Sequence, residues 1–316
     1  MERALHDMTM AFIEAGHRVD ISAPREKPGT WGVDPDCFHR VPRWRTRGVT
    51  DGASGWRPLL LRAARPVRRV LSPHYDLHIG FRWTRNINPL IRADRHWVNP
   101  SGNVMTWEDF ADYDAVAMQA PGNTIFLPDT MPRVLLPPPL RPLATRCDEV
   151  AGLPDQYVLS VFNSARDAKG GVDLATLVEQ SPLPVVWCTG AASPNHGVPD
   201  NVLRHPNLIT LREPSREQLR FLYEHAFAYV SLSISEGFGW AVADALRYTP
   251  RVVSRRVGVM SFDEALQPGV TLLDDTLGAA GLDWEALSAA AAPTVGRDLD
   301  WLSSGSFCRR VQTLLG

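Results

Sequence analysis

The chain has 316 residues, of which 44% are hydrophobic and 22% charged, and its formal net charge at pH 7 is −2. This length is about twice that of one domain, so the sequence predicts a globular protein with two domains. A charge so close to zero provides no electrostatic basis for binding nucleic acid. The basic clusters 40–47 and 62–69 are interpreted first as solvated faces, and second as contacts to phosphate or an acceptor.

The cysteines and histidines indicate no metal site. None of the cysteines (Cys37, Cys147, Cys188 and Cys308) forms a Cys-x-x-Cys pair, so a reducing cytoplasm is the expected location. The nine histidines show no metal-ligand spacing. Neither a secretory leader nor an apolar run of about 18 residues is present, so we expect no stable membrane insertion.

The first part of the chain predicts one helix followed by short strands. Apolar residues share one face of a helix over 2–13, which Gly16 ends. Strands are predicted at 18–22, 75–80, 96–99, 115–119 and 134–136. Most of these strands are too apolar for a sheet with one wet face, which favours a parallel sheet covered by helices. Residues 23–60 lack periodicity and are predicted to form a long loop near a cleft.

Strand–helix alternation is clearer after the predicted linker at 137–157. Strands are predicted at 157–162, 184–188, 208–211, 228–232 and 252–254, and helices at 171–180, 216–226 and 239–247. The pattern predicts an α/β protein of two doubly wound domains facing a cleft, with the boundary placed at 145/146.

One candidate site is the turn Ser235-Glu236-Gly237-Phe238-Gly239, between a buried strand and a helix. Ligands of open parallel sheets bind beyond the carboxyl ends of the strands. The glycines permit close approach, and the N–H groups of a helix start attract anions. Glu236 is interpreted as a hydrogen-bond acceptor, and Asp244, about 80° around the helix, faces the same ligand. The alternative is that Glu236 caps the helix and Asp244 is an exposed polar position.

A second candidate site is the turn from Asn163 to Gly171, which contains Arg166 and Lys169. Two cations in a glycine-containing turn at the carboxyl end of a strand are suited to a diphosphate, Arg166 as a fork and Lys169 as a point charge. The alternative is a solvated turn with a glycine-rich helix entry.

The order of these segments over 157–258 resembles the donor-binding domain of retaining glycosyltransferases of family 4, which have the two-domain GT-B fold. Relatives carry an E-x7-E pattern inside a phrase like SEGFG, and here Glu236 and Asp244 take the two acidic positions. Residues 207–211 and 217–223 resemble the strand and helix that line the nucleobase pocket. Arg212 and Glu213 would then form the turn beside the base.

The resemblance implies two Rossmann-like domains, an acceptor-binding domain over 1–145 and a nucleotide-sugar donor-binding domain over 146–316. It implies hexosyl transfer from a UDP-, GDP- or TDP-sugar to an unidentified acceptor hydroxyl, with retention of anomeric configuration. No metal and no cofactor is expected beside the NDP-sugar co-substrate. The implied catalytic residues are Glu236, Lys169 and Arg166. The implied donor-binding residues are Arg166, Lys169, Arg212, Glu213, Glu236, Gly237, Phe238, Gly239 and Asp244.

Three departures from the family pattern are visible. Asp244 replaces a glutamate, and Tyr248 replaces a small residue before Thr249-Pro250. The first strand and glycine-rich turn of the first domain are absent before Met1, so we expect that strand to be supplied from upstream or by the assembly. Asp244 and the missing first strand motivate an alternative, a non-catalytic nucleotide-sugar-binding or regulatory subunit on the same scaffold.

Overall fold

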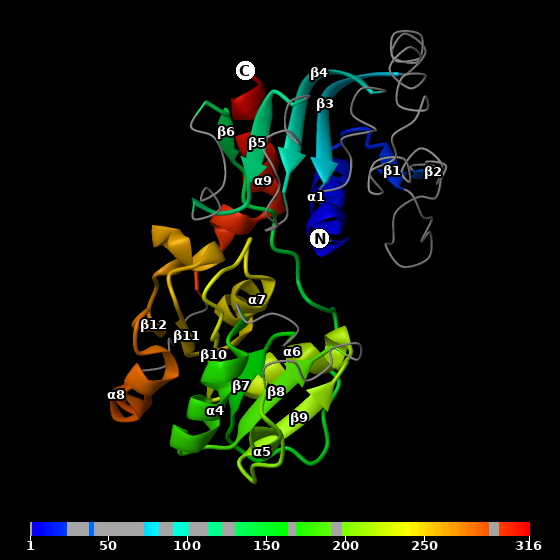
Figure 1. Cartoon of the computed structure of the whole chain (residues 1–316). Coiled ribbons are helices and arrows are strands. Elements are labelled where there is room, and N and C mark those ends of the chain that lie inside the picture. Colours follow the sequence, from blue (N-terminus) through cyan, green and yellow to red (C-terminus); the bar gives the residue numbers. More distant parts are fainter. Residues whose placement is uncertain are drawn as a thin grey trace, which may run out of the picture. The chain divides into compact units, whose positions relative to one another are not determined.

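The structure is a computed structural model that describes residues 2–23, 38–40, 73–81, 91–100, 113–121, 130–163, 169–190, 198–290 and 297–316. The chain divides into two compact units (Figure 1). Unit 1 comprises Met1–Gln119, Asn123–Pro139 and Leu302–Gly316, and unit 2 comprises Ala120–Gly122 and Leu140–Trp301. None of the helices in these ranges combines the length and apolar character needed to cross a membrane.

Unit 1 contains a parallel sheet with the strand order β3-β4-β5-β6. Its strands are β3 (His74–Phe81), β4 (Arg92–Asn99), β5 (Ala115–Met118) and β6 (Arg133–Leu135). Side chains alternate between the two faces of a strand. Accordingly, Ala115 and Ala117 join the core shared with the terminal helices, and Val116 and Met118 join a separate cluster with Tyr113.

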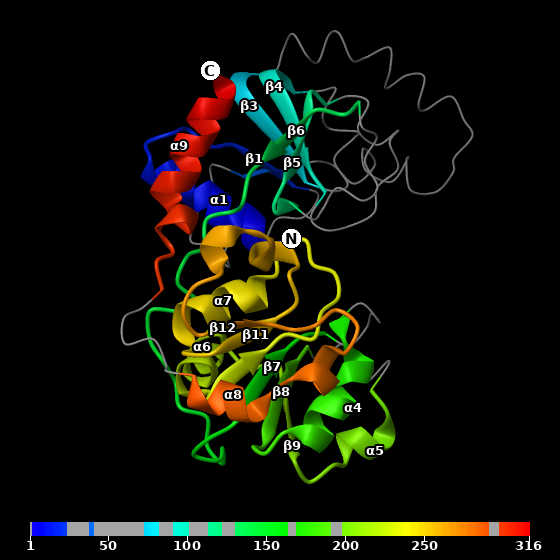
Figure 2. The same ribbon diagram turned by 90° about the vertical axis from the view of Figure 1, so that its left-hand side faces the viewer.

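The terminal helices α1 (Glu2–Glu14) and α9 (Ser304–Leu315) lie side by side in unit 1 (Figure 2). Phe307 and Val311 of α9 are buried in one cluster with Met8 and Ala11 of α1. The sequence assigns all of 146–316 to the second domain. In the structure, Leu302–Gly316 belong to unit 1 instead. Local periodicity does not reveal a packing partner about 300 residues away.

Unit 1 also contains a short parallel pair, β1 (Ile21–Ala23) and β2 (Phe38–Arg40). The strand predicted at 18–22 therefore begins three residues later than expected, and β2 corrects part of the long loop predicted over 23–60. The rest of that loop, the basic cluster 62–69 and most of the cluster 40–47 lie outside the described residues.

Unit 2 is built on a parallel sheet with the order β12-β11-β10-β7-β8-β9. Its strands are β7 (Val158–Val161), β8 (Val185–Thr189), β9 (Leu208–Arg212), β10 (Ala228–Val230), β11 (Val252–Ser254) and β12 (Val270–Leu272). Counted along the unit, this order is that of the doubly wound nucleotide-binding sheet. The order reverses between β7 and β10, which makes this the topological switch point.

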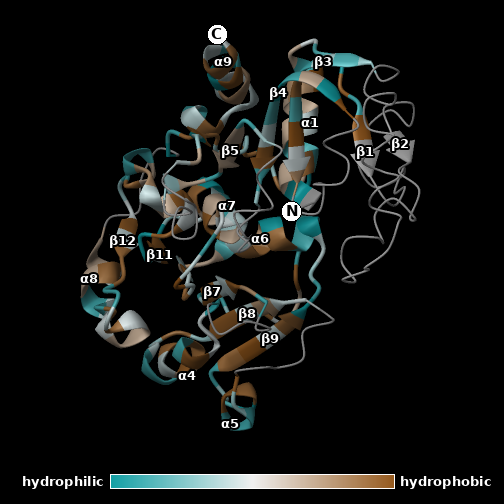
Figure 3. Cartoon of the chain, turned by 45° about the horizontal axis from the view of Figure 1, so that its top comes forward, coloured by the Kyte–Doolittle hydropathy of each residue, from teal (hydrophilic) through white to brown (hydrophobic). Residues whose placement is uncertain are grey.

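Helices cover both faces of this sheet. They are α4 (Gly171–Gln180), α5 (Asp200–Leu203), α6 (Arg216–His225), α7 (Trp240–Tyr248) and α8 (Trp284–Ala289). Leu174 of α4 shares one core cluster with Val158 and Val230. Tyr229 points to the opposite face, where its ring lies 5.6 Å from that of Tyr223 on α6. The apolar character of β8, whose five residues are all buried, follows from this two-sided burial (Figure 3).

Candidate active site

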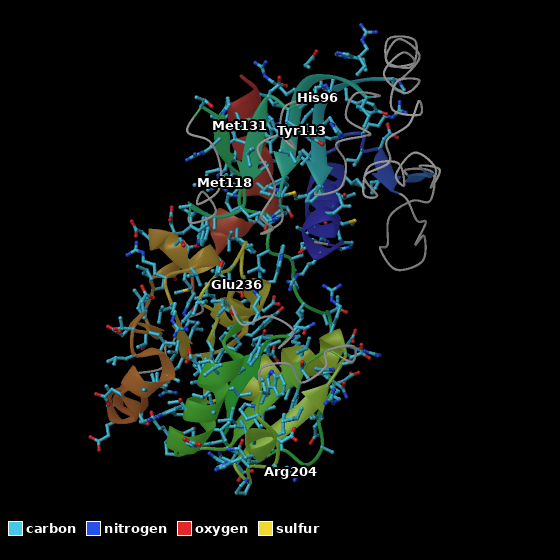
Figure 4. All side chains as sticks on the ribbon, in the orientation of Figure 1. His96, Tyr113, Met118, Met131, Arg204 and Glu236 are labelled. Carbon is cyan, nitrogen blue, oxygen red and sulfur yellow. The ribbon has the colours of Figure 1, made fainter. Side chains whose placement is uncertain are left out.

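Lys169 and Glu236 form an ion pair at the carboxyl edge of the unit 2 sheet. Lys169 follows β7 and Glu236 follows β10, and these strands are hydrogen-bonded neighbours. Nζ of Lys169 lies 2.5 Å from Oε1 of Glu236, and the two side chains are 25% and 16% exposed. Figure 4 labels Glu236 at this end of unit 2. The pair therefore lies at the switch point, where open α/β sheets bind nucleotides.

Gly170 determines where Lys169 lies. Gly170 has φ 83° and is the N-cap of α4, with no side-chain hydrogen bond capping that helix. A Cβ at Gly170 would lie 2.4 Å from Cβ and 2.5 Å from the carbonyl oxygen of Leu232, so the close approach requires glycine. Because the N-cap residue Gly170 has no side chain to cap α4, the first-turn N–H groups of this helix can bind an anion.

Glu236 lies in the turn before α7, not in the helix. Gly239, with φ 80°, is the N-cap residue of α7, so Glu236 does not occupy the N-cap position. The prediction that Asp244 lies about 80° around one helix from Glu236 is also wrong, because only Asp244 belongs to α7. Gly258 packs directly behind the turn, since a Cβ there would lie 2.8 Å from Cβ of Glu236.

Asp244 is 3% exposed, which excludes the alternative of an exposed polar position. Its carboxylate and that of Glu236 both act on the buried phenol of Tyr229. Burial raises the pKa of Tyr229 above its usual value, the charges of Glu236 and then Asp244 raise it further, and a hydrogen bond with Ser231 lowers it. The two predicted acidic residues therefore both influence the ionisation of this phenol.

Phe238 is 2% exposed, and its ring packs edge-to-face on Trp240 at 4.8 Å. Its carbonyl accepts a 2.6 Å hydrogen bond from the N–H of Val259. The ring of Phe238 therefore belongs to the core, so a contact between Phe238 and the nucleotide-sugar would have to involve the main chain. Gly237 is the partly buried residue between Glu236 and Phe238.

Arg212 and Glu213 lie at the carboxyl end of β9, on the same edge of the sheet. Both are exposed, and Glu213 has φ 49° while its N–H donates to the carbonyl of Thr189 at 2.9 Å. β9 is two strands from β7, or about 10 Å. This separation suits a nucleotide whose base lies apart from its diphosphate. Arg166 lies outside the described residues.

Sequence reasoning missed Asp173 and Arg255, which form an ion pair between the first turn of α4 and the end of β11, with 2.8 Å between Oδ2 and Nη2. The two residues are far apart in sequence, and no spacing pattern connects them. In the part of the chain that the structure describes, no group of three or more His, Cys, Asp and Glu residues is placed to hold a metal ion. Metal independence stays a prediction, to be checked by assay with a chelator.

No protein-family model and no curated protein sequence matches the chain. Solved structures do match. A glycosyltransferase from Rickettsia africae ESF-5 has a TM-score of 0.69 at 10% identity, covering 99% of this chain and 93% of that one. A sucrose-phosphate synthase from Thermosynechococcus elongatus has a TM-score of 0.65 at 16% identity, covering 99% and 88%. A UDP-forming α,α-trehalose-phosphate synthase from Burkholderia xenovorans has a TM-score of 0.56 at 12% identity, covering 82% and 78%.

At these identities the likeness establishes the fold. The chain has the GT-B fold, with two Rossmann-like domains, and the fold that the sequence resemblance implies is confirmed.

Proposed function

We propose that this protein transfers a glycosyl group from a nucleoside-diphosphate sugar to an acceptor hydroxyl, with retention of anomeric configuration and without a metal. The observation that carries the proposal is the Lys169–Glu236 ion pair at the switch point of a nucleotide-binding sheet. A cation for the leaving group and a carboxylate for sugar hydroxyls meet there, beside two helix starts whose N-cap residues are glycines.

Donor binding opens this ion pair. The diphosphate oxygens take over Lys169 Nζ, assisted by Arg166 and by the N–H groups at the starts of α4 and α7. Glu236 is then released to accept hydrogen bonds from the sugar. Each side chain exchanges a protein partner for a ligand partner, so neither is left as an uncompensated charge.

Transfer breaks the bond between the anomeric carbon and the diphosphate oxygen and forms a bond to the acceptor oxygen on the same face. The acceptor proton goes to the departing diphosphate. Negative charge develops on phosphate oxygens, so the preorganised cation and helix starts supply the main stabilisation of the transition state. Glu236 orients the sugar so that its anomeric carbon faces the acceptor.

The nucleoside lies along the edge toward β9 in this proposal. Asp244 accepts hydrogen bonds from the ribose, and the turn of Arg212 and Glu213 lies beside the base. The spacing of about 10 Å between the ends of β7 and β9 supports this direction. The base is uracil, guanine or thymine, and a thermal-shift panel of UDP, GDP, TDP and ADP identifies it, because a ligand that binds only the folded state raises stability.

Lys169→Ala tests the assignment of the diphosphate site. We expect it to weaken binding of the matching nucleoside diphosphate by about 1.5–3 kcal/mol, while binding of the nucleoside is nearly unchanged. The matched control is Arg204→Ala, which removes an exposed cation from the opposite end of unit 2 (Figure 4). Equal losses for both ligands in calorimetric titration, or no loss, would place Lys169 among ordinary surface charges.

The second candidate is a non-catalytic nucleotide-sugar-binding subunit, which the shorter carboxylate at Asp244 favours. Both candidates predict nucleotide binding, so turnover separates them. Release of nucleoside diphosphate from the NDP-sugar is measured with a panel of hydroxyl acceptors. Sugar phosphates come first in that panel, because two of the structural neighbours are named as sugar-phosphate synthases.

A further inference from the structure

We propose that Arg255, together with Asp173, is a positioning pair that sets the place of Lys169 for the donor diphosphate. This inference rests on the proposed function and adds residues that the sequence resemblance does not assign. Arg255 follows β11 directly and is 5% exposed, and both Nη atoms of its guanidinium donate to protein acceptors, so we assign it no direct contact with the donor. Any effect on the donor has to act through its neighbours.

Two hydrogen bonds connect Arg255 to the elements that carry the site. Nη1 donates to the carbonyl of Leu232 at 2.6 Å, just beyond the end of β10. Nη2 donates to Oδ2 of Asp173 at 2.8 Å, in the first turn of α4. One side chain therefore joins three elements, the ends of β10 and β11 and the start of α4.

The carbonyl of Leu232 links this pair to Lys169. Arg255 contacts that oxygen, and Gly170 approaches it so closely that a Cβ there would lie 2.5 Å away. Lys169 immediately precedes Gly170. Movement of the Leu232 carbonyl or of the first turn of α4 therefore moves Lys169 relative to Glu236. Small displacements of charged groups in a catalytic site have large effects on rate and binding.

The charge balance also points to positioning. The side chain of Asp173 is 31% exposed, whereas that of Arg255 is buried. The acidic end of the ion pair therefore lies near solvent at the start of α4, and the basic end lies in the interior. Nε of Arg255 is buried without a hydrogen-bond acceptor among the described residues. The guanidinium thus depends on Leu232 and Asp173, and it fixes the distance between them.

A double-mutant cycle tests the inference. Arg255→Met should weaken nucleoside diphosphate binding about tenfold while nucleoside binding stays unchanged, because only the diphosphate uses Lys169. In the Lys169→Ala background, Arg255→Met should cause no further loss. Arg255→Lys, which keeps the charge and one donor direction, should restore part of the affinity.

Gly278→Ala tests the same pair without removing a charge, and it decides the matter if Arg255→Met fails to fold. A Cβ at Gly278 would lie 2.6 Å from Nη2 of Arg255 and 3.0 Å from Oδ2 of Asp173, so the end of the arginine side chain has to move. The matched control is Gly152→Ala, which has a similar positive φ and meets no atom within 4 Å. We expect only Gly278→Ala to weaken diphosphate binding.

The outcomes are distinguishable. If Lys169→Ala weakens diphosphate binding but the losses from Lys169→Ala and Arg255→Met add, the positioning inference is overturned and the proposed function stands. The inference is also overturned if Arg255→Met weakens nucleoside and nucleoside diphosphate binding equally. It is overturned as well if Gly278→Ala and Gly152→Ala have the same effect on diphosphate binding. A native chain that binds no nucleoside diphosphate overturns the proposed function and the inference together.

Discussion

The two ends of α7 differ in how their polar groups are satisfied. At the N-terminal end the N-cap residue is Gly239, which has no side chain to cap the helix, and among the described ion pairs the nearby Glu236 pairs with Lys169 alone. At the C-terminal end, Arg297 donates to five main-chain carbonyls, those of Leu246, Thr249, Pro250, Pro268 and Gly269. Burial lowers the pKa of Arg297 to about 10.

Two further side chains close the C-terminal end. Arg247 donates to the carbonyl of Leu140 at 2.7 Å, and the hydroxyl of Tyr248 accepts from the N–H of Leu143 at 2.9 Å. One end of the helix is therefore held by the protein, while the other keeps groups that a ligand can take over. The same helix contains structural and functional polar residues, and the exchangeability of their partners separates them.

Arg297→Met should give the largest change, and it should be a change in stability. Five hydrogen bonds to main-chain carbonyls are lost, and among the described residues only the Gly269 carbonyl keeps a second donor, the N–H of Val252, so we expect the free energy of unfolding to fall by about 3 kcal/mol or more. Nucleoside diphosphate affinity, measured well below the melting temperature, should stay within about twofold. Denaturant unfolding checks this against Arg204→Met, an exposed arginine of the same unit. A large loss of affinity with little loss of stability would remove the distinction between the two ends.

Asp244→Ala tests whether the middle of α7 belongs to the ligand-binding end of the helix. Asp244 lies on the nucleoside side in our account, so its removal should weaken nucleoside and nucleoside diphosphate binding equally, by about 1–3 kcal/mol. This differs from Lys169→Ala, which should affect only the diphosphate. Asp244→Asn keeps the shape and serves as the control for folding, and Asp244→Glu restores the family residue. Unchanged affinity for both ligands would remove Asp244 from the donor site.

The stability at alkaline pH tests the burial of β8 in the middle of the sheet, independently of ligand binding at the edge of the sheet. Burial raises the pKa of Cys188 on β8 from 9.0 to about 12. A raised folded-state pKa contributes stability that is present below pH 9 and is lost between pH 9 and 12. Relative to Cys188→Ala, the native chain should lose about 1 kcal/mol of stability by pH 10. Parallel pH profiles for the native chain and Cys188→Ala would contradict this.

Tyr248→Phe should give the smallest effect. Only the hydrogen bond from Leu143 is lost, so the free energy of unfolding should fall by about 1 kcal/mol, with nucleotide affinity unchanged. The ring also lies under the guanidinium of Arg220, at 5.6 Å from its centroid, and Tyr248→Phe keeps that contact. Tyr248→Leu, which removes both, should cost more. If Tyr248→Phe instead weakens nucleotide binding, the C-terminal end of α7 is not purely structural.

The parts predicted from sequence are those governed by local pattern. Helix α4 lies at its predicted bounds, and the glycine-rich turns place Lys169 and Glu236 at the carboxyl edge of one sheet. The departure at Tyr248 was visible in the sequence, and the structure explains it by the contact with Leu143.

The parts that sequence reasoning missed depend on distant partners. Helix α9 packs on α1 from the other end of the chain, and Arg255 pairs with Asp173 across 82 positions. Neither partner leaves a local signal. The relation between Glu236 and Asp244 was derived from a helical angle, whereas it depends on where Gly239 starts the helix.

The kinetics of Glu236→Gln test the central claim most directly. If Glu236 holds the transferred sugar, kcat should fall about a hundredfold. Nucleoside diphosphate affinity should stay the same or rise, because Lys169 loses the carboxylate that competes with the diphosphate. The measurement is steady-state turnover with varied donor, beside direct titration of the nucleoside diphosphate. Full kcat in Glu236→Gln would show that Glu236 lies outside the reaction centre and would contradict the account.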